Sequence, residues 1–105
     1  MPAIQIGQIA DVPEGTGKAF DVQGRRIAVF HVAGELYAID DTCSHAEASL
    51  SEGELDTDEL CIECPLHGSL FDLRSGKPRT LPAYEPVRTY KAYSEGDTLF
   101  VEYPA

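Results

Sequence analysis

The sequence has little positive charge. Of its 105 residues, 8 are Lys or Arg and 18 are Asp or Glu, so the formal net charge at pH 7 is −10. Phosphate backbones and anionic membrane surfaces repel a protein with this balance. The composition therefore argues against nucleic acids and membranes as partners, and a basic protein surface is the natural complement.

Long hydrophobic runs are also missing. The longest apolar run, Ile27 to Val32, is interrupted by His31 and is far shorter than the roughly 20 residues of a membrane span. Residues 1–15 contain no basic residue and include Asp11 and Glu14, which does not match a secretion signal. We expect a soluble, cytoplasmic protein.

Cysteine is scarce, with three in the chain. An odd number cannot pair completely, and disulfides are rare in the cytoplasm. The cysteines are therefore interpreted as metal ligands or reactive thiols and not as a disulfide framework.

No segment shows a convincing helical period. Short extended runs alternate with turn-forming residues such as Gln23-Gly24, Ala33-Gly34 and Gly96-Asp97, which predicts an all-β single domain over residues 1–105, built as an antiparallel sandwich or small barrel. The expected strands are Ile4–Ile9, Ala19–Val22, Ile27–Val32, Leu36–Ile39, Leu60–Glu63, Leu70–Leu73, Val87–Tyr93 and Thr98–Tyr103. In the last strand, Leu99, Val101 and Tyr103 are expected on one face.

Two segments interrupt the alternation and are predicted to be loops, at about residues 41–48 and 64–69. Each loop offers one thiolate and one imidazole, with the cysteine first. Two such loops facing each other suit an asymmetric [2Fe–2S] centre, in which one iron takes both thiolates and the other both imidazoles. The candidate ligands, for the metal and for the cofactor alike, are Cys43, His45, Cys64 and His67.

Zinc is the main alternative for this ligand set. Two cysteines and two histidines are a common tetrahedral zinc site, but zinc modules usually place like ligands together, next to a helix. A second alternative is a buried thiol pair with two unrelated surface histidines.

The paired motif Cys43-Ser44-His45 and Cys64-Pro65-Leu66-His67-Gly68 resembles that of the Rieske family, and the likeness continues through Phe71-Asp72 and Ser75-Gly76 over nearly the whole chain. This resemblance implies one [2Fe–2S] cluster in a subdomain formed by two loops, with electrons leaving through the histidine edges. Around the ligands, Pro65 would stiffen its loop and Gly68 would let the backbone approach the cluster.

Two departures separate the chain from respiratory Rieske proteins. Those proteins bridge the cluster loops with a disulfide, and the matching positions here are Ala48 and Leu66. They also have a serine and a tyrosine that donate to sulfur; this chain keeps Ser69 but has Phe71 at the tyrosine position. With one donor fewer, the expected reduction potential lies in the lower half of the family's range of about −150 to +300 mV.

Three other features receive structural interpretations. Cys61, three residues before Cys64, is interpreted as a buried strand thiol and not as half of a redox Cys-x-x-Cys pair. His31, within an apolar strand, is expected to be a structural histidine. The segment Gly15-Thr16-Gly17-Lys18 lacks the outer residues of a phosphate loop and is expected to be a turn.

What is missing also limits the function. A terminal oxygenase needs a further iron on two histidines and a carboxylate, and only His31 remains; a nicotinamide-binding fingerprint is absent as well. The chain is therefore predicted to be a non-enzymatic relay, similar to the ferredoxin components of aromatic-ring dioxygenase systems. Its partners would be a flavin-containing ferredoxin reductase and a terminal oxygenase.

The alternative is a fixed small subunit of an assimilatory NAD(P)H nitrite reductase. In either case, six of the seven carboxylates between His45 and Cys64 form a group, with no Lys or Arg among residues 44–73. They either steer a basic patch of the partner toward the cluster or form a solvated face. They are Glu47, Glu52, Glu54, Asp56, Asp58 and Glu59.

Overall fold

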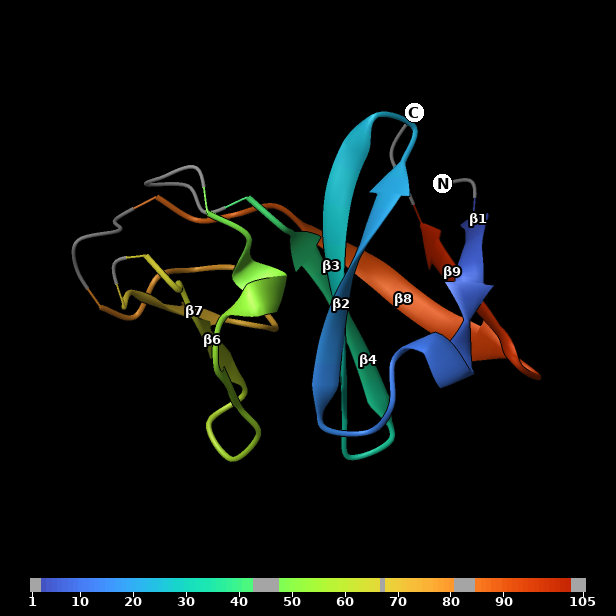
Figure 1. Cartoon of the computed structure of the whole chain (residues 1–105), viewed down its shortest axis with the longest axis horizontal. Helices are drawn as coiled ribbons and strands as arrows, with labels where there is room; N and C mark the ends of the chain where they lie inside the picture. Colours follow the sequence, from blue (N-terminus) through green and yellow to red (C-terminus); the bar gives the residue numbers. More distant parts are fainter. Residues whose placement is uncertain (1–2, 43–47, 67, 81–84, 103–105) are drawn as a thin grey trace.

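The computed structural model describes residues 3–42, 48–66, 68–80 and 85–102, and these form two antiparallel sheets (Figure 1). The larger sheet has the strand order β1-β9-β8-β4-β3-β2, and the smaller has the order β5-β6-β7. The all-β prediction is confirmed. The strands are β1 (Ala3–Gln8), β2 (Thr16–Val22), β3 (Arg25–Val32), β4 (Glu35–Asp40), β5 (Leu55–Asp56), β6 (Cys61–Glu63), β7 (Leu70–Asp72), β8 (Thr89–Glu95) and β9 (Thr98–Glu102).

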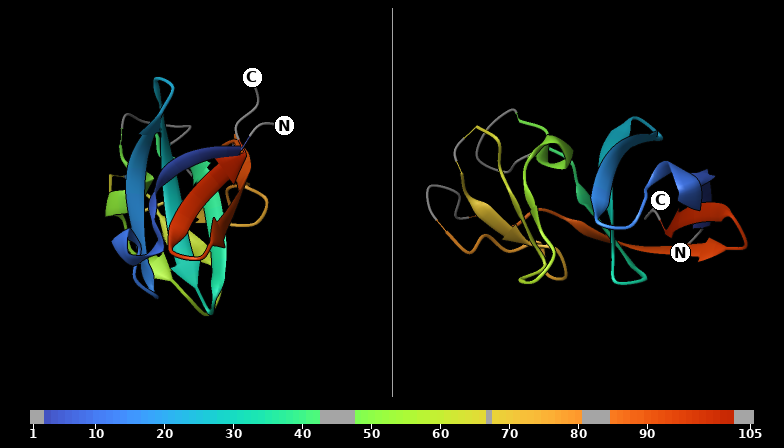
Figure 2. Two further views of the ribbon diagram at one scale, coloured as in Figure 1. Left: turned by 90° about the vertical axis from the view of Figure 1, so that its right-hand side faces the viewer. Right: turned by 60° about the horizontal axis from the view of Figure 1, so that its bottom comes forward.

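The two sheets lie at opposite ends of an elongated molecule, with extents of 38 × 29 × 18 Å. The six-stranded sheet, which we call the base, curls on the right of Figure 1, and the three-stranded sheet lies on the left; the same separation is visible in the second view of Figure 2. We call the part of the chain from Asp41 to Val87 the loop subdomain. None of the helices within the described ranges is long and apolar enough to cross a membrane.

Strand β3 contributes to two hydrophobic cores because it is covered on both faces. Ile27 and Val29 pack in the core of the base, whereas Ala28 and Phe30 pack in a second core with residues of the loop subdomain. Successive side chains of a strand point to opposite faces, so a continuous apolar run is what a strand between two cores requires.

Strand β9 shows the expected alternation. Leu99 and Val101 are fully buried, while Thr98, Phe100 and Glu102 between and beside them are partly exposed. Tyr103, expected on the buried face, lies outside the described residues.

The hairpins that connect β2 to β3 and β3 to β4 are two-residue loops at Gln23-Gly24 and Ala33-Gly34. All four residues have positive φ, between 49° and 86°. Such turns match the right-handed twist of the strands they join, and glycine at the second position lowers their cost. The prediction that these glycine-containing pairs form turns is therefore confirmed.

One local prediction was wrong, and three short elements were not predicted. Strand β2 begins at Thr16, so Gly15 to Lys18 is mostly strand and not a turn; a Cβ on Gly17 would lie 2.3 Å from the Phe30 ring, which explains the glycine as room for that ring. Strand β5 was not expected, and neither were two short 3-10 helices, η1 (Ile9–Asp11) and η2 (Leu50–Glu52).

Candidate metal centre

The first predicted loop begins where β4 ends and is closed by a narrow neck. Thr42 and Ser49 form an isolated antiparallel bridge, and the amide of Leu50 donates to the carbonyl of Asp41 at 2.6 Å. The neck brings residues 41 and 50 together, so the segment between them starts and ends at one place. Residues 43–47, which include two predicted ligands and Glu47, lie outside the described residues.

Asp41 holds this neck from inside the protein. Its side chain is fully buried; Oδ1 accepts a hydrogen bond from the Ser51 amide at 2.9 Å, and Oδ2 lies 3.3 Å from Nε of Arg26. The contact between Arg26 and Asp41 is an ion pair without a hydrogen bond. Oδ2 of Asp41 has no hydrogen-bond partner among the described residues. Asp41 thus ties η2 to the base, a role that the sequence analysis missed.

The second predicted loop is a tight turn between β6 and β7. The Cys64 amide donates to the Ser69 carbonyl, and the Gly68 amide donates to the Cys64 carbonyl, both at 2.8 Å. Gly68 has φ +75°, a conformation that L side chains rarely adopt, although a Cβ there would meet no described atom. The glycine is therefore explained by its backbone conformation; its expected close approach to a cluster stays a prediction.

Cys64 is fully buried and forms no disulfide. It packs with Leu50, Ile62 and Phe71, while the next two residues, Pro65 and Leu66, are exposed. A buried free sulfur at the base of an exposed turn fits a metal ligand that is shielded from water but close to the surface.

Cys61 and Cys64 are both buried, free cysteines. Cys61 lies within β6 opposite Asp72, is 1% exposed and forms no disulfide with Cys64. Burial raises the pKa of the Cys61 thiol, although the nearby Arg79 guanidinium opposes this shift. A thiol that stays protonated is a poor nucleophile, and the interpretation of Cys61 as a buried strand thiol is confirmed.

Ser69 and Phe71 both lie close to Cys64 in the sequence and are fully buried. Ser69 follows the turn directly, and Phe71 shares the apolar core around Cys64. Ser69 therefore offers a hydroxyl at a buried position, and Phe71 offers none. At a buried position a hydroxyl has a large effect on its surroundings.

A third segment is fastened to β7 by Arg79. Its guanidinium NH2 donates to Asp72 Oδ2 at 2.9 Å and to the Glu59 carbonyl at 2.8 Å. The Leu70 amide also donates to the Thr80 hydroxyl at 2.8 Å. These contacts hold the chain just before residues 81–84, which lie outside the described residues, and the sequence analysis did not find them.

The Asp72–Arg79 pair also affects the titration of Asp72. Burial alone would raise the pKa of the Asp72 carboxyl, but hydrogen bonds from Arg79 and from the amides of Arg74 and Ser75 outweigh burial and hold that pKa below its ordinary value. Asp72 is therefore a structural anion in the folded protein.

The carboxylates between the two loops differ in their roles. Glu52, Glu54, Asp56, Asp58 and Glu59 are exposed. Asp56 Oδ1 also accepts hydrogen bonds from the amides of Asp58 and Glu59, both at 3.0 Å. Asp56 thus closes the turn between β5 and β6.

His31 lies in β3 of the base. Nδ1 lies 2.9 Å from the Val12 carbonyl, and Nε2 lies 3.1 Å from Oε2 of Glu14. Both ring nitrogens are occupied by contacts within the fold, which confirms the structural interpretation of this histidine.

Of the four predicted ligands, the structure describes Cys64; Cys43, His45 and His67 lie outside the described residues. The described surroundings fit an iron–sulfur cofactor, since they place a buried, unpaired cysteine in a closed turn beside the neck of the other predicted loop.

The model of the Rieske [2Fe–2S] domain family matches residues 3–91, so the chain belongs to this family. Its cofactor is one [2Fe–2S] cluster. The interpretation of the ligand set as a zinc site is therefore dropped. The family match also confirms the fold expected from the paired motif.

Two of the similar proteins are ferredoxins of dioxygenase systems. The chain is 48% identical to the "3-phenylpropionate/cinnamic acid dioxygenase ferredoxin subunit" of Escherichia coli K12 over 99% of its own length and 96% of that protein. The solved ferredoxin of carbazole 1,9a-dioxygenase from Nocardioides aromaticivorans IC177 has a TM-score of 0.90 and 38% identity, covering 96% and 97% of the two chains.

A third match comes from a complex of reduced oxygenase and oxidized ferredoxin in carbazole 1,9a-dioxygenase. The matching chain has a TM-score of 0.85 and 34% identity, with 94% and 91% of the two chains covered. A putative NADH-dependent nitrite reductase small subunit from Mycobacterium tuberculosis also matches, with a TM-score of 0.85, 19% identity and 99% and 96% coverage. At that identity, the last likeness shows the fold alone.

Proposed function

We propose that the chain is a one-electron carrier that takes electrons from an NAD(P)H-dependent flavin reductase and delivers them to a terminal aromatic-ring oxygenase. The observation that carries this proposal is the 48% identity to a dioxygenase ferredoxin subunit over nearly the whole of both chains. The solved complex of an oxygenase with a ferredoxin, one chain of which is 34% identical to this chain, supports the choice of acceptor. The chain itself catalyses no reaction in this scheme.

The ligand set that we propose is Cys43 and Cys64 on one iron and His45 and His67 on the other. When bound, the cluster supplies reversible one-electron chemistry at a potential raised by its neutral nitrogen ligands. The chain provides a buried position for the Cys64 sulfur, a turn closed by two backbone hydrogen bonds, and a neck fastened by Asp41. These features hold the Cys64 end of the proposed ligand set in one arrangement.

The proposed carrier function is tested by exchanging components. The chain, purified anaerobically, replaces the ferredoxin subunit of the E. coli 3-phenylpropionate dioxygenase system while that system's reductase and oxygenase are retained. We expect NADH-dependent hydroxylated product to form only when the chain is present. The proposal fails if the cluster-loaded chain is reduced by the reductase but yields no product under conditions in which the E. coli ferredoxin does.

The reduction potential tests the expected influence of Phe71. The buried phenyl ring offers no hydroxyl to sulfur, so we expect a midpoint in the lower half of the range from about −150 to +300 mV. Protein-film voltammetry measures it directly. A Phe71→Tyr variant should shift the midpoint upward, and a midpoint near the upper limit in the wild-type chain would contradict the prediction.

A further inference from the structure

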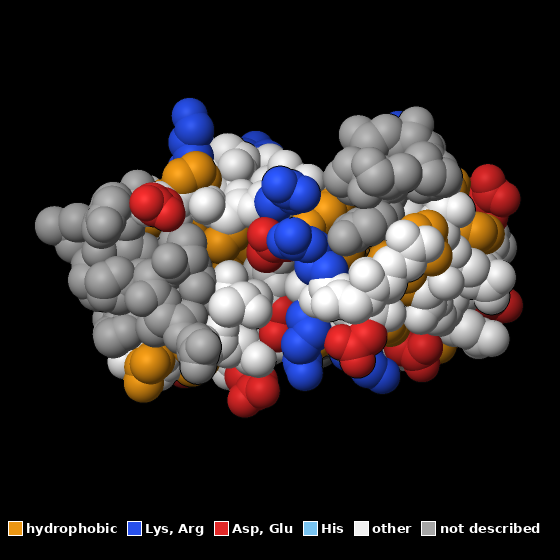
Figure 3. Space-filling view, turned by 90° about the horizontal axis from the view of Figure 1, so that it is seen from above, with side chains coloured by type: hydrophobic (Ala, Val, Ile, Leu, Met, Phe, Trp, Pro, Cys, Tyr) orange, Lys and Arg blue, Asp and Glu red, His pale blue; other side chains and the backbone are white. Residues whose placement is uncertain are grey.

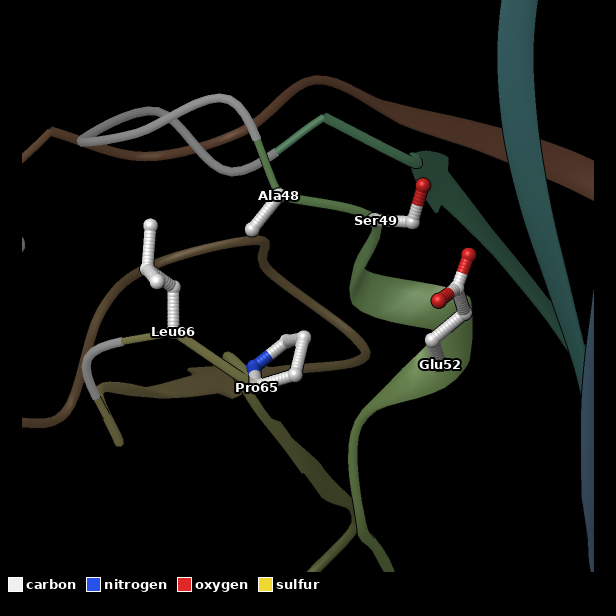
Figure 4. A pocket seen from close by; sticks show the side chains of 5 residues that line it. All are labelled: Ala48, Ser49, Glu52, Pro65 and Leu66. Carbon is white, nitrogen blue, oxygen red and sulfur yellow. The ribbon is translucent and has the colours of Figure 1, made fainter.

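Two segments of the loop subdomain adjoin the proposed cysteine ligands, and they face each other across an open hollow. The first segment, residues 48–53, follows Cys43 in the chain and includes η2; the second, residues 61–66, contains Cys64. A cluster that binds both cysteines needs a fixed separation between these segments. Figure 4 shows side chains of both segments at the hollow, which is lined by Ala48, Ser49, Glu52, Pro65 and Leu66.

Ion pairs of Lys or Arg do not set this separation. Residues 44–73 contain no Lys or Arg, so neither segment offers such a cation to the other. On the face drawn in Figure 3, most Lys and Arg side chains gather across the middle of the molecule. The two segments are joined instead by apolar packing, since Leu50 of η2 and Cys64 belong to one buried core, and by a close backbone contact at Gly53.

Gly53 follows η2 and lies against the backbone of Glu63, the residue before Cys64. A Cβ at position 53 would overlap the Glu63 carbonyl oxygen and would lie 2.9 Å from the Glu63 carbonyl carbon. Both distances are shorter than the 3.0 Å that real Cβ atoms keep from other heavy atoms. Because the obstacle is backbone, it cannot rotate aside as the end of a side chain can. A methyl group at position 53 would therefore push the two segments apart.

The backbone conformation of Gly53 does not explain why this residue is glycine. Its φ of −81° and ψ of −177° are extended values that L residues adopt readily. Gly68 in the opposite turn is the reverse case, because its φ is +75° and a Cβ there would meet no described atom. Glycine at position 53 is therefore explained by the close approach of the two segments.

Hydrogen bonds fix the backbone on both sides of this contact. On one side, the Gly53 amide donates to the Leu50 carbonyl at 3.0 Å, and the Leu50 amide donates to the Asp41 carbonyl at the neck. On the other side, the Glu63 amide donates to the Glu54 carbonyl at 2.9 Å, which extends the pairing of β5 with β6. A continuous path of backbone contacts therefore runs from the neck of the first predicted loop to the start of the second.

We propose that Gly53 is a positioning residue for the [2Fe–2S] cluster, and that its contact with the Glu63 carbonyl sets the separation of the segments that supply Cys43 and Cys64. The inference rests on the proposed ligand set and adds a residue that binds neither iron nor sulfide. Backbone packed against backbone makes this spacing, so it belongs to the polypeptide. The cluster does not have to draw the two segments together.

The spectrum of the cluster-loaded protein tests this role. Gly53→Ala adds one methyl group and no charge, and the segments should move apart while each keeps its own hydrogen bonds. We expect the g-values in the electron paramagnetic resonance spectrum of the reduced variant to differ from those of wild type. The visible absorption of the oxidised variant should disappear about 10-fold faster in excess EDTA, the size of effect that residues around a metal site typically have on metal binding.

The matched control is Gly76→Ala, which causes the same kind of collision elsewhere in the loop subdomain. A Cβ at position 76 would overlap the Val87 carbonyl oxygen, and the φ of Gly76 is +74°, so the substitution is conformationally strained as well. Neither Gly76 nor Val87 belongs to the two segments. We expect Gly76→Ala to lower the urea midpoint at least as far as Gly53→Ala does, but to keep the g-values and the rate of cluster loss of wild type.

A second comparison applies if Gly53→Ala is purified without a cluster. Cys64→Ser, which lacks a proposed ligand, is then the cluster-free reference. The two proteins should have the same far-UV circular dichroism and the same urea transition, because the methyl group disturbs the spacing of the two segments and not the base. A Gly53→Ala protein that is unfolded where Cys64→Ser is folded would overturn the proposal, since Gly53 would then be required by the fold as a whole.

Two further results would also overturn the proposal. One is a Gly53→Ala protein with the g-values and the cluster retention of wild type. The other is an equal spectral change in Gly76→Ala, because any disturbance of the loop subdomain would then have this effect. None of these measurements involves a reductase or an oxygenase. A wild-type chain that yields no product in the exchange of components would refute the carrier function and leave the role of Gly53 standing.

Discussion

The base and the loop subdomain are held together in different ways. In the base, long strands pair continuously; β2 and β3 match over seven residue pairs, from Thr16↔His31 to Val22↔Arg25. In the loop subdomain, β5 and β6 share two pairs, and side chains such as Asp41, Asp72 and Arg79 bond to the backbone of neighbouring segments. The comparison teaches that long strand pairing holds the base together, while the loop subdomain combines short strand pairing with individual polar contacts and an apolar core that it shares with β3 and β4.

The largest expected effect is on cofactor retention, through the two buried cysteines of the loop subdomain. Cys64→Ser should yield protein without iron, sulfide or the visible absorption of the cluster, because a hydroxyl is a much poorer iron ligand than a thiolate. Cys61→Ala should retain the cluster and lose only about 1 kcal/mol of stability through a small cavity. Iron and sulfide analysis checks both; equal retention by the two variants would refute the assignment of Cys64.

The second largest effect concerns the base. Leu99 is fully buried in the base core, so Leu99→Ala should lower the free energy of unfolding by about 2–5 kcal/mol. Because the base core is separate from the core around Cys64, the electron paramagnetic resonance spectrum of the reduced folded variant should match that of wild type. Urea unfolding measures the first quantity, and an altered spectrum would show that the two regions are not independent.

A smaller effect is expected from the Asp72–Arg79 contact in the loop subdomain. The folded state lowers the Asp72 pKa, so this carboxylate stabilises the fold at pH values above its unfolded pKa, and the stabilisation disappears as pH falls through the folded pKa. Asp72→Asn should therefore lower the thermal midpoint at pH 7, and the gap from wild type should shrink below about pH 4.

Asp21, exposed on β2, provides the control for this pH dependence. Thermal unfolding of Asp21→Asn should follow wild type across the same pH range. A gap between Asp72→Asn and wild type that stays constant down to about pH 2 would show that the lowered pKa is not the source of the effect.

The smallest effect is expected in the base, at the hydrogen bond from Tyr90 to Asp40 Oδ1 at 2.6 Å. Tyr90→Phe should cost about 0.5–1.5 kcal/mol. Burial, together with this bond, raises the pKa of Tyr90 to about 12, so the neutral phenol stabilises the fold fully below about pH 10, and that stability is lost as pH rises toward 12.

The matched control for Tyr90 is Tyr93→Phe on the same strand, where the ring stacks on Phe100 with centroids 5.4 Å apart. Urea unfolding at pH 7 and at about pH 10.5 should separate the two variants, because the alkaline loss of stability depends on the Tyr90 hydroxyl. If Tyr90→Phe shows the same alkaline loss as wild type, another group is responsible.

The same comparison explains what the sequence could predict. Strand β9 was predictable because one of its faces is buried and the other is partly exposed, so apolar and polar residues alternate. The two-residue turns were predictable because their backbone needs positive φ, which glycine adopts easily. The Cys-x-His and Cys-Pro-x-His-Gly segments were recognisable because the ligands are close in sequence. Each of these signals is local.

The remaining features depend on contacts between distant segments. Strand β5 is two residues long and is defined by its pairing with β6. Local sequence propensity therefore does not predict it. The burial of Asp41 depends on Arg26 and Ser51, and the glycine at position 17 depends on the ring of Phe30. An acidic residue followed by a predicted loop, or a glycine two residues after another glycine, gives no sign of such partners.

The pairing of β1 with β9, which places Ala3 opposite Glu102, has a practical consequence. Both described ends of the chain lie in the base, on the other side of the molecule from β6 and β7 (Figure 1). A tether added at either end would therefore start far from the cluster turn and from Leu66. The protein could be anchored on an electrode or fused to a reductase through either end while the turn that carries Cys64 stays open to the solution.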